Sequence, residues 1–207
     1  MKKRIAKHTL KLRHRIVKML MPSLYQDTLR AISISNTVQA TPRPMILFLK
    51  EYLKETNLTG AEIGVAYGDN AVSILELLPM RKLFLIDPYV PYMENNRLVT
   101  HEEEEQQAKK KLSHYPQVTW LRKTSDQARR DINETLDFVY IDGNHSYEYT
   151  KKDIANYYPL IRSGGVIGGH DYKAFFHPGI EKAVDEFAAE RGRLKLHAVF
   201  PDWWFIK

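Results

Sequence analysis

The sequence predicts an α/β fold with a seven-stranded, mostly parallel sheet, helices on both faces and a closing antiparallel hairpin. After Gly60, short apolar runs alternate with amphipathic segments, as in chains built from βαβ units. A glycine-containing turn follows the first of these runs. The last two runs, 194–200 and 203–207, are separated only by Pro201-Asp202. Parallel neighbours need a crossover of about a dozen residues, so this pair is expected to be antiparallel.

The individual elements follow from the same pattern. Pro44 suits the first turn of a helix that covers 45 to about 56, because its fixed φ is helical. The apolar runs expected as strands are 61–65, 82–87, 117–121, 136–142, 165–170, 194–200 and 203–207. The segments expected as further helices lie near 69–78, 101–113, 125–133, 147–157 and 179–191.

The length of 207 residues suits one such domain, preceded by a basic arm. Thr41-Pro42-Arg43-Pro44 divides 1–40 from 41–207, since a proline disfavours helix in the residue before it. Residues 1–20 hold eight Lys and Arg residues and no acid, so the rest of the chain carries −2 against +6 for the whole. We expect 1–40 to be partly helical or flexible. Contact of 1–20 with an anionic membrane surface or a partner, and nucleic-acid binding, are the alternatives.

Composition excludes several classes of function. The chain has no cysteine, which rules out disulfides, thiolate zinc sites and cysteine nucleophiles, and agrees with a cytoplasmic location. No apolar run approaches the roughly 18–20 residues of a membrane span. The near-neutral body argues against nucleic acid as the substrate.

The segment Glu62-Ile-Gly64-Val-Ala66-Tyr67-Gly68-Asp-Asn70 reads as a strand end, a glycine turn and a helix start. Its spacing lets the loop backbone lie against a flat, charged cofactor. Ala66 stands where the dinucleotide motif G-x-G-x-x-G has its second glycine, so a diphosphate cradle is incomplete. The residues expected to bind the cofactor here are Glu62, Gly64, Ala66, Tyr67, Gly68 and Asn70.

Two more strand ends extend this cofactor site. Leu83-Phe-Leu-Ile-Asp87 ends in a carboxylate at the tip of the second strand, where ribose hydroxyls are bound in doubly wound folds. Ser125 and Asp126 follow the third strand. They are expected to contact the adenine ring, to cap the next helix, or both.

The strongest chemical signal is a pair of later strand ends. Asp142 ends one apolar run and His145 follows in the turn, where imidazole can take a proton from a substrate hydroxyl near neutral pH. The next run ends in His170-Asp171. Carboxylates of Asp142 and Asp171 from adjacent strand tips could hold a divalent cation such as Mg²⁺. Alternatively, His170 and Asp171 only form hydrogen bonds or shape the acceptor pocket.

From about Gly60 to Lys207 the chain resembles the class I S-adenosylmethionine (SAM) methyltransferases, with their Rossmann-like sheet. The wording Ile-Asp-Gly-Asn-His-Ser-Tyr-Glu and Gly-Gly-Val-Ile-Gly-Gly-His-Asp is similar to the macrocin and mycinamicin sugar O-methyltransferases, and to cephalosporin hydroxylase-like proteins. The resemblance implies SAM as cofactor, Asp142 as a Mg²⁺ ligand and His145 as general base. The closing pair there is Glu-Asp, whereas His170 is a nitrogen donor, which leaves Mn²⁺ or a metal-free site open.

The sequence therefore predicts an O-methyltransferase acting on a sugar or another small hydroxylated acceptor, with a homo-oligomer as one expected form of assembly. Aromatic loops at 88–92 and 172–178 either wall the acceptor pocket or pack in the core. An NAD-type oxidoreductase is the alternative enzyme, disfavoured by Ala66 and the closing hairpin. A non-catalytic SAM-binding module targeted by its basic arm is the other alternative.

Overall fold

The computed structural model describes residues 40–94, 97–99, 101, 103–174, 177–192 and 194–207. Thr41–Lys207 form a compact unit. The predictions for the basic arm lie outside the described residues, apart from Ala40. Among the described residues, none of the helices has both the length and the apolar character needed to cross a membrane.

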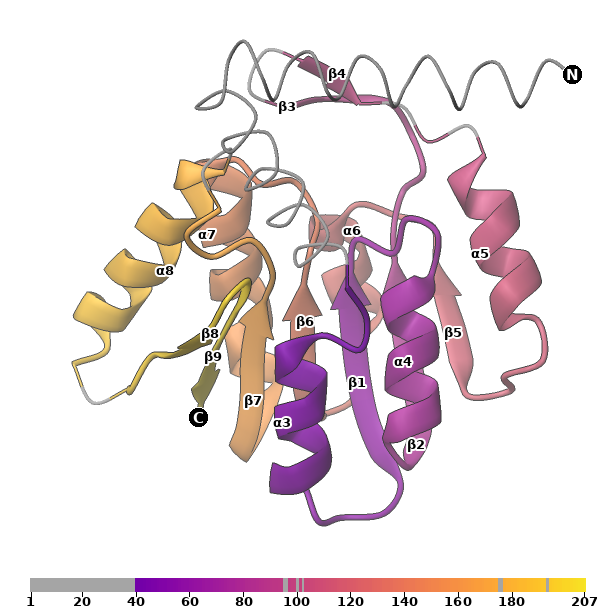
Figure 1. The fold of residues 1–207 in the computed structure, drawn as a ribbon, viewed down its shortest axis with the longest axis horizontal. Helices are drawn as coiled ribbons and strands as arrows, with labels where there is room; N and C mark the ends of the chain where they lie inside the picture. The colour runs from indigo at the N-terminus through magenta and orange to yellow at the C-terminus, as the bar shows by residue number, and fades with distance from the viewer. Residues whose placement is uncertain (1–39, 95–96, 100, 102, 175–176, 193) are drawn as a thin grey trace, which may run out of the picture. The chain divides into compact units, whose positions relative to one another are not determined.

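The compact unit contains one seven-stranded sheet in the order β5-β2-β1-β6-β7-β9-β8 (Figure 1). The parallel strands are β1 (Leu58–Ile63), β2 (Met80–Ile86), β5 (Val118–Leu121), β6 (Leu136–Ile141) and β7 (Ile161–Gly169). Two antiparallel strands follow, β8 (His197–Val199) and β9 (Asp202–Ile206), with β9 paired to β7. The predicted fold class is confirmed, including the closing hairpin.

Helices cover both faces of this sheet. Successive side chains of each strand point to opposite faces, so both faces carry apolar residues that the helices bury. In β2, Leu83 and Leu85 face the core layer of α3 (Pro44–Tyr52), α4 (Asp69–Leu77) and α5 (Glu104–Leu112). Phe84 and Ile86 face the other layer, formed by α6 (Ser125–Ala128), α7 (Tyr147–Tyr157) and α8 (Pro178–Glu190). In Figure 1, α3 and α4 lie over one face of the sheet and α7 over the other.

Three local differences from the expected elements have physical causes. A small hairpin of β3 (Tyr92–Glu94) and β4 (Arg97–Val99) was not predicted, because its sequence has no apolar run. The helix expected over 125–133 ends early as α6 and a 3₁₀ turn, since Ile132 leaves the helical region and is buried. Strand β7 begins at Ile161, before the expected 165, because Ile161 already pairs with Leu136 of β6; the register then shifts, and Gly164 in the irregular stretch takes a φ of 73°.

The buried carboxylate of Asp202 ties the closing hairpin to three other elements. Its Oδ2 accepts a hydrogen bond from Met45 N at the start of α3, at 2.8 Å. Its Oδ1 accepts from the Tyr140 hydroxyl of β6 at 3.0 Å and lies 2.8 Å from His170 Nδ1, just after β7. Asp202 is fully buried, so these donors take the place of water around it.

Replacing Asp202 with alanine should lower the free energy of unfolding by at least about 3 kcal/mol, because three buried donors lose their acceptor together. Guanidinium denaturation followed by circular dichroism measures this. Glu51→Ala is the matched control, since Glu51 lies on the surface with 79% of its side chain exposed, and a change within about 0.5 kcal/mol is expected there. Equal losses in the two variants would contradict the anchoring role of Asp202.

Candidate active site

The predicted site residues follow parallel strands, and the structure brings the strand ends to one edge of the sheet. Asp142 N donates to Ile63 O at 2.7 Å, which joins the ends of β6 and β1. His170 N donates to Ile141 O at 3.0 Å, which joins the ends of β7 and β6. In Figure 1 these strands point the same way, so the loops that follow them share an edge. Open α/β sheets bind ligands at this edge.

The glycine turn after β1 packs tightly against the turn after β6. Gly64 has a φ of 83°, and a Cβ placed there would lie 2.1 Å from the carbonyl oxygen of Asp142. Ala66 also has a positive φ, of 45°, and Gly68 caps α4 with a φ of 78°. Glycine is therefore required at position 64 both for conformation and for close approach.

Asp87 holds this turn in place. Its Oδ2 accepts hydrogen bonds from Val65 N at 2.9 Å and Ala66 N at 3.2 Å, and its Oδ1 accepts from Tyr89 N at 2.8 Å. The ribose contact expected of Asp87 remains a prediction, and it would use the remaining lone pairs of these oxygens. Shaping the turn is an additional role that the sequence did not indicate. Tyr67, also expected at the cofactor, has 41% of its surface exposed.

Glu62 and Asn70 form a buried pair beside the turn. Asn70 Nδ2 donates to Glu62 Oε1 at 2.8 Å. Glu62 Oε2 and Asn70 Oδ1 are buried acceptors with no hydrogen-bond donor among the described residues. Burial raises the pKa of Glu62 to about 8, although the bond from Asn70 opposes this. Two buried acceptors without donors suit a ligand that carries an ammonium group.

Ser125 and Asp126 are engaged with α7, and neither caps α6 as one alternative expected. Thr124 is the cap, and it forms a capping box with Gln127. The Ser125 hydroxyl donates to the buried carboxyl of Asp153, whose pKa is raised to about 7 mainly by burial. Asp126 Oδ1 accepts from Asn156 Nδ2 at 2.8 Å. Contact of Ser125 and Asp126 with an adenine ring remains a prediction.

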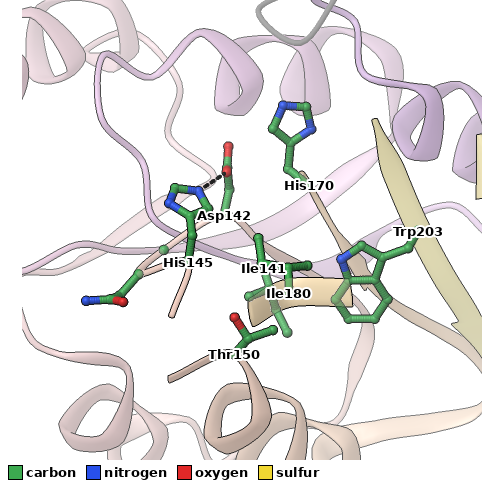
Figure 2. A pocket seen from close by; sticks show the side chains of 9 residues that line it. Ile141, Asp142, His145, Thr150, His170, Ile180 and Trp203 are labelled. Carbon is green, nitrogen blue, oxygen red and sulfur yellow. Dashed lines mark hydrogen bonds and ion pairs between the residues drawn. The ribbon is translucent and has the colours of Figure 1, made fainter. Parts of the chain in front are cut away.

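His145 lies between the two expected carboxylates. Its Nε2 is 3.4 Å from Asp142 Oδ1 and 3.1 Å from Asp171 Oδ2, and Figure 2 shows the contact with Asp142. Burial alone would raise the pKa of Asp171, but the hydrogen bond from His145 and the charges of nearby histidines lower it below its ordinary value. The structure therefore brings the three residues together into one polar cluster. A small pocket beside it is lined by Asp142, His145 and His170 together with apolar side chains.

His177 belongs to this cluster although the sequence did not point to it. Its Nε2 is 4.0 Å from Asp171 Oδ2, and its ring lies 4.2 Å from that of His145 between centroids. One donor atom each from His145, Asp171 and His177 lie within 4.8 Å of one another. Two nitrogens and one oxygen suit Mn²⁺ or Zn²⁺ better than Mg²⁺. The sequence offered one signal for His177, its place in the loop 172–178 after a strand end.

His170 does not join the donor group in which it was expected. It is 3% exposed, and its Nδ1 lies 2.8 Å from Asp202 Oδ1. Its Nε2 contacts the guanidinium of Arg43 and is 3.8 Å from Asp171 Oδ1. Turning the ring toward Asp202 satisfies a buried polar group, and this explains why the expected metal set of Asp142, Asp171 and His170 is not formed.

Arg43 also reaches the cluster, from a segment that had suggested only a domain boundary. Its Nη2 lies 3.6 Å from Asp142 Oδ2, with 13% of the Arg43 side chain exposed. Burial alone would lower the pKa of Arg43, but the neighbouring charges, with that of Asp142 the largest, raise it above its ordinary value. The cluster thus contains a permanently charged cation.

Comparison with known proteins agrees with this geometry. Residues 61–172, more than half of the chain, match the family model described as "Methyltransferase domain". A curated protein of Acanthamoeba polyphaga mimivirus, named "Uncharacterized protein R132", is 27% identical over 149 residues. That alignment covers 69% of this chain and 64% of the viral protein, so the chain spans less than two thirds of this relative.

Solved structures show the same fold at low sequence identity. The O-methyltransferase NovP superposes with a TM-score of 0.60 at 18% identity, covering 84% of this chain and 79% of NovP. SMU.1697c of Streptococcus mutans, in complex with SAH, superposes with a TM-score of 0.60 at 14% identity, covering 80% of this chain and 97% of that one.

The family match spans the glycine turn, Asp87, the β6 turn and Asp171, which are the features that surround the candidate cofactor and base sites. The match favours a methyltransferase over the NAD-type alternative. The chain belongs to the methyltransferase-domain family, and its sheet has the fold of solved methyltransferases.

Proposed function

We propose that the protein transfers a methyl group from SAM to a hydroxyl of a sugar or another small hydroxylated acceptor. The observation that carries this proposal is the position of His145, held between two carboxylates at the turn that packs against Gly64. A base there lies beside the glycine turn that receives the cofactor. SAM, when bound, supplies a methyl group on a positively charged sulfur.

The residues around the glycine turn fit this cofactor. Glu62 Oε2 and Asn70 Oδ1 are buried acceptors suited to the ammonium of its methionine part. Asp87 keeps the turn in its conformation through Val65 N and Ala66 N. The absence of a side chain at Gly64 lets this turn lie against the turn after β6, which carries His145.

His145 would act as the general base. Its Nε2 faces Asp142 and Asp171, so we assign the resting proton to Nε2 and the accepting role to Nδ1. With SAM bound as the methyl donor, Nδ1 of His145 would accept the proton that the acceptor hydroxyl loses as it is methylated. The two carboxylates stabilise the imidazolium that results.

The acceptor is proposed from the chemistry of the site and from the resemblance to sugar O-methyltransferases. Two aromatic residues of the expected pocket walls, Tyr89 and Tyr172, are only 7% and 6% exposed. They pack in the core, as the second alternative expected. Tyr92 is partly buried and stacks on His101, with 5.5 Å between ring centroids. Recognition of the acceptor is therefore assigned to the rim around His145 and not to these tyrosines.

The residues expected to hold Mg²⁺ do not fit that role. Asp142 Oδ2 faces the guanidinium of Arg43, and His170 is engaged with Asp202. Mg²⁺ requires a near-octahedral set of oxygen ligands, which this arrangement does not offer. The mechanism above therefore uses the protein's own side chains.

Replacing Glu62 with glutamine should weaken binding of S-adenosylhomocysteine at least tenfold, because the ammonium group of the ligand then no longer faces a buried carboxylate. With a pKa of about 8, Glu62 is mostly protonated at pH 7 before the ligand binds. An ammonium favours the carboxylate, so binding should release most of one proton and should tighten as pH rises from 6 to 8.

Calorimetry in buffers of different ionisation enthalpy measures both the affinity and the proton release. Glu76→Gln, on the exposed side of α4, is the matched control and should bind like the unaltered protein. Unchanged affinity in Glu62→Gln, or an unaltered protein that binds without releasing a proton, would count against this assignment.

Replacing His145 with alanine should lower kcat/KM about 10²- to 10⁴-fold, the usual contribution of a general base. The measurement is formation of S-adenosylhomocysteine with a panel of hydroxylated sugar acceptors. Affinity for S-adenosylhomocysteine should stay unchanged, because His145 is assigned to the acceptor side. His114→Ala is the control, since His114 is exposed and its ring lies against that of Tyr115. Full turnover by His145→Ala would refute the base assignment and favour a non-catalytic role.

A further inference from the structure

We propose that Arg43 supplies the positive charge that a divalent cation would otherwise provide at Asp142, so that this site works without Mg²⁺. The proposal rests on the proposed function, because it assigns Arg43 as a positioning residue for the same methyl transfer. Arg43 acts through Asp142 and does not itself touch the reacting atoms.

The backbone of Arg43 is fixed, which gives its side chain a defined direction. Arg43 O accepts hydrogen bonds from Ile46 N at 3.0 Å and Leu47 N at 3.2 Å, at the first turn of α3. In the same turn, Met45 N donates a hydrogen bond to Asp202 Oδ2. The guanidinium therefore enters the cluster from an anchored helix start and not from a loop free to swing.

Asp142 connects Arg43 to the base. Its Oδ2 lies 3.6 Å from Arg43 Nη2, while its Oδ1 lies 3.4 Å from His145 Nε2. One carboxylate thus has a guanidinium on one oxygen and the imidazole on the other. A cation on Oδ2 fixes the plane of the carboxylate, and this orients the ring of His145.

His170 completes the arrangement as an acceptor for the guanidinium. Its Nδ1 lies beside Asp202 Oδ1, so Nδ1 carries the proton and Nε2 accepts from Arg43. A histidine used in this way has no lone pair left for a metal. His170, which stands where the similar sugar O-methyltransferases have a carboxylate, therefore provides a partner for Arg43.

The charges around Arg43 agree with a built-in cation. Asp142, Asp202 and Asp171 all act on it, and together they keep its guanidinium charged despite burial. A second cation held by Asp142 would be repelled by this guanidinium across a few ångströms of poorly solvated space. Bound Mg²⁺ and Arg43 are thus alternatives at Asp142.

The test is a calorimetric titration of Mg²⁺ into the whole protein without SAM or acceptor. We expect no binding to the unaltered protein below millimolar concentrations. Arg43→Gln should bind Mg²⁺ at least tenfold more tightly, and a further Asp142→Asn change should abolish the gain. Arg43→Lys keeps the charge and should behave like the unaltered protein. Arg162→Gln is the matched control. Arg162 lies outside the cluster, and its Nε is 2.6 Å from Asp137 Oδ1.

Submillimolar Mg²⁺ binding by the unaltered protein, or a folded Arg43→Gln variant with no gain, would overturn the proposal. Should Arg43→Gln fail to fold, by circular dichroism, the titration of the unaltered protein alone decides. In turnover assays Mg²⁺ should partly restore kcat in Arg43→Gln and leave the unaltered protein unaffected, a rescue that a purely structural role would not give. Because the titrations need no turnover, failure of methyl transfer and failure of the Arg43 assignment are separate results.

Discussion

The central constraint in this protein is the parallel pairing of β1 with β6, which continues past the strand ends. Asp142 N donates to Ile63 O, and the absence of a side chain at Gly64 lets the two following turns touch. The proposed cofactor acceptors Glu62 and Asn70 flank one turn, and the other turn carries the proposed base His145. Their distance is therefore set by the sheet itself, and positioning of donor and acceptor needs no flexible loop.

A series of buried polar contacts connects Asp202 to Asp142 at the site. Asp202 is buried among donors from α3, β6 and the residue after β7. That last residue, His170, contacts Asp202 through Nδ1 and Arg43 through Nε2. Arg43 then faces Asp142, which faces His145. The proposed base at the rim is thus connected to a chain of polar partners that begins in the closing hairpin. Buried polar groups of this kind are tolerated because each has its counterpart.

The sequence was informative where function coincides with a strand end. The polarity switch after an apolar run located Glu62, Asp87, Asp142 and Asp171, because parallel strands deliver their ends to one edge. It was silent on side chains that reach the site across the fold. Arg43 and His170 are separated by 127 residues, and nothing in the local pattern around either one indicates their contact.

Local motifs also failed where burial decides the outcome. Ser125 and Asp126 had the right chemistry for a cap, yet Thr124 takes that place because α7 offers the other two residues better partners. The sequence indicated His170 as a metal ligand, but its Nδ1 lies 2.8 Å from Asp202 Oδ1. In each case the competing partner comes from an element distant in sequence.

The family match covers 61–172, whereas Arg43 precedes it and Asp202 follows it. A shorter protein cut to that window would retain the glycine turn and His145, but it would lack both ends of the polar chain beneath them. Such a fragment would preserve the recognisable signature of the family while leaving Asp142 without its counter-ion and β7 without the neighbour that completes the sheet. Methyltransferase motifs alone are thus a poor guide to where this working unit begins and ends.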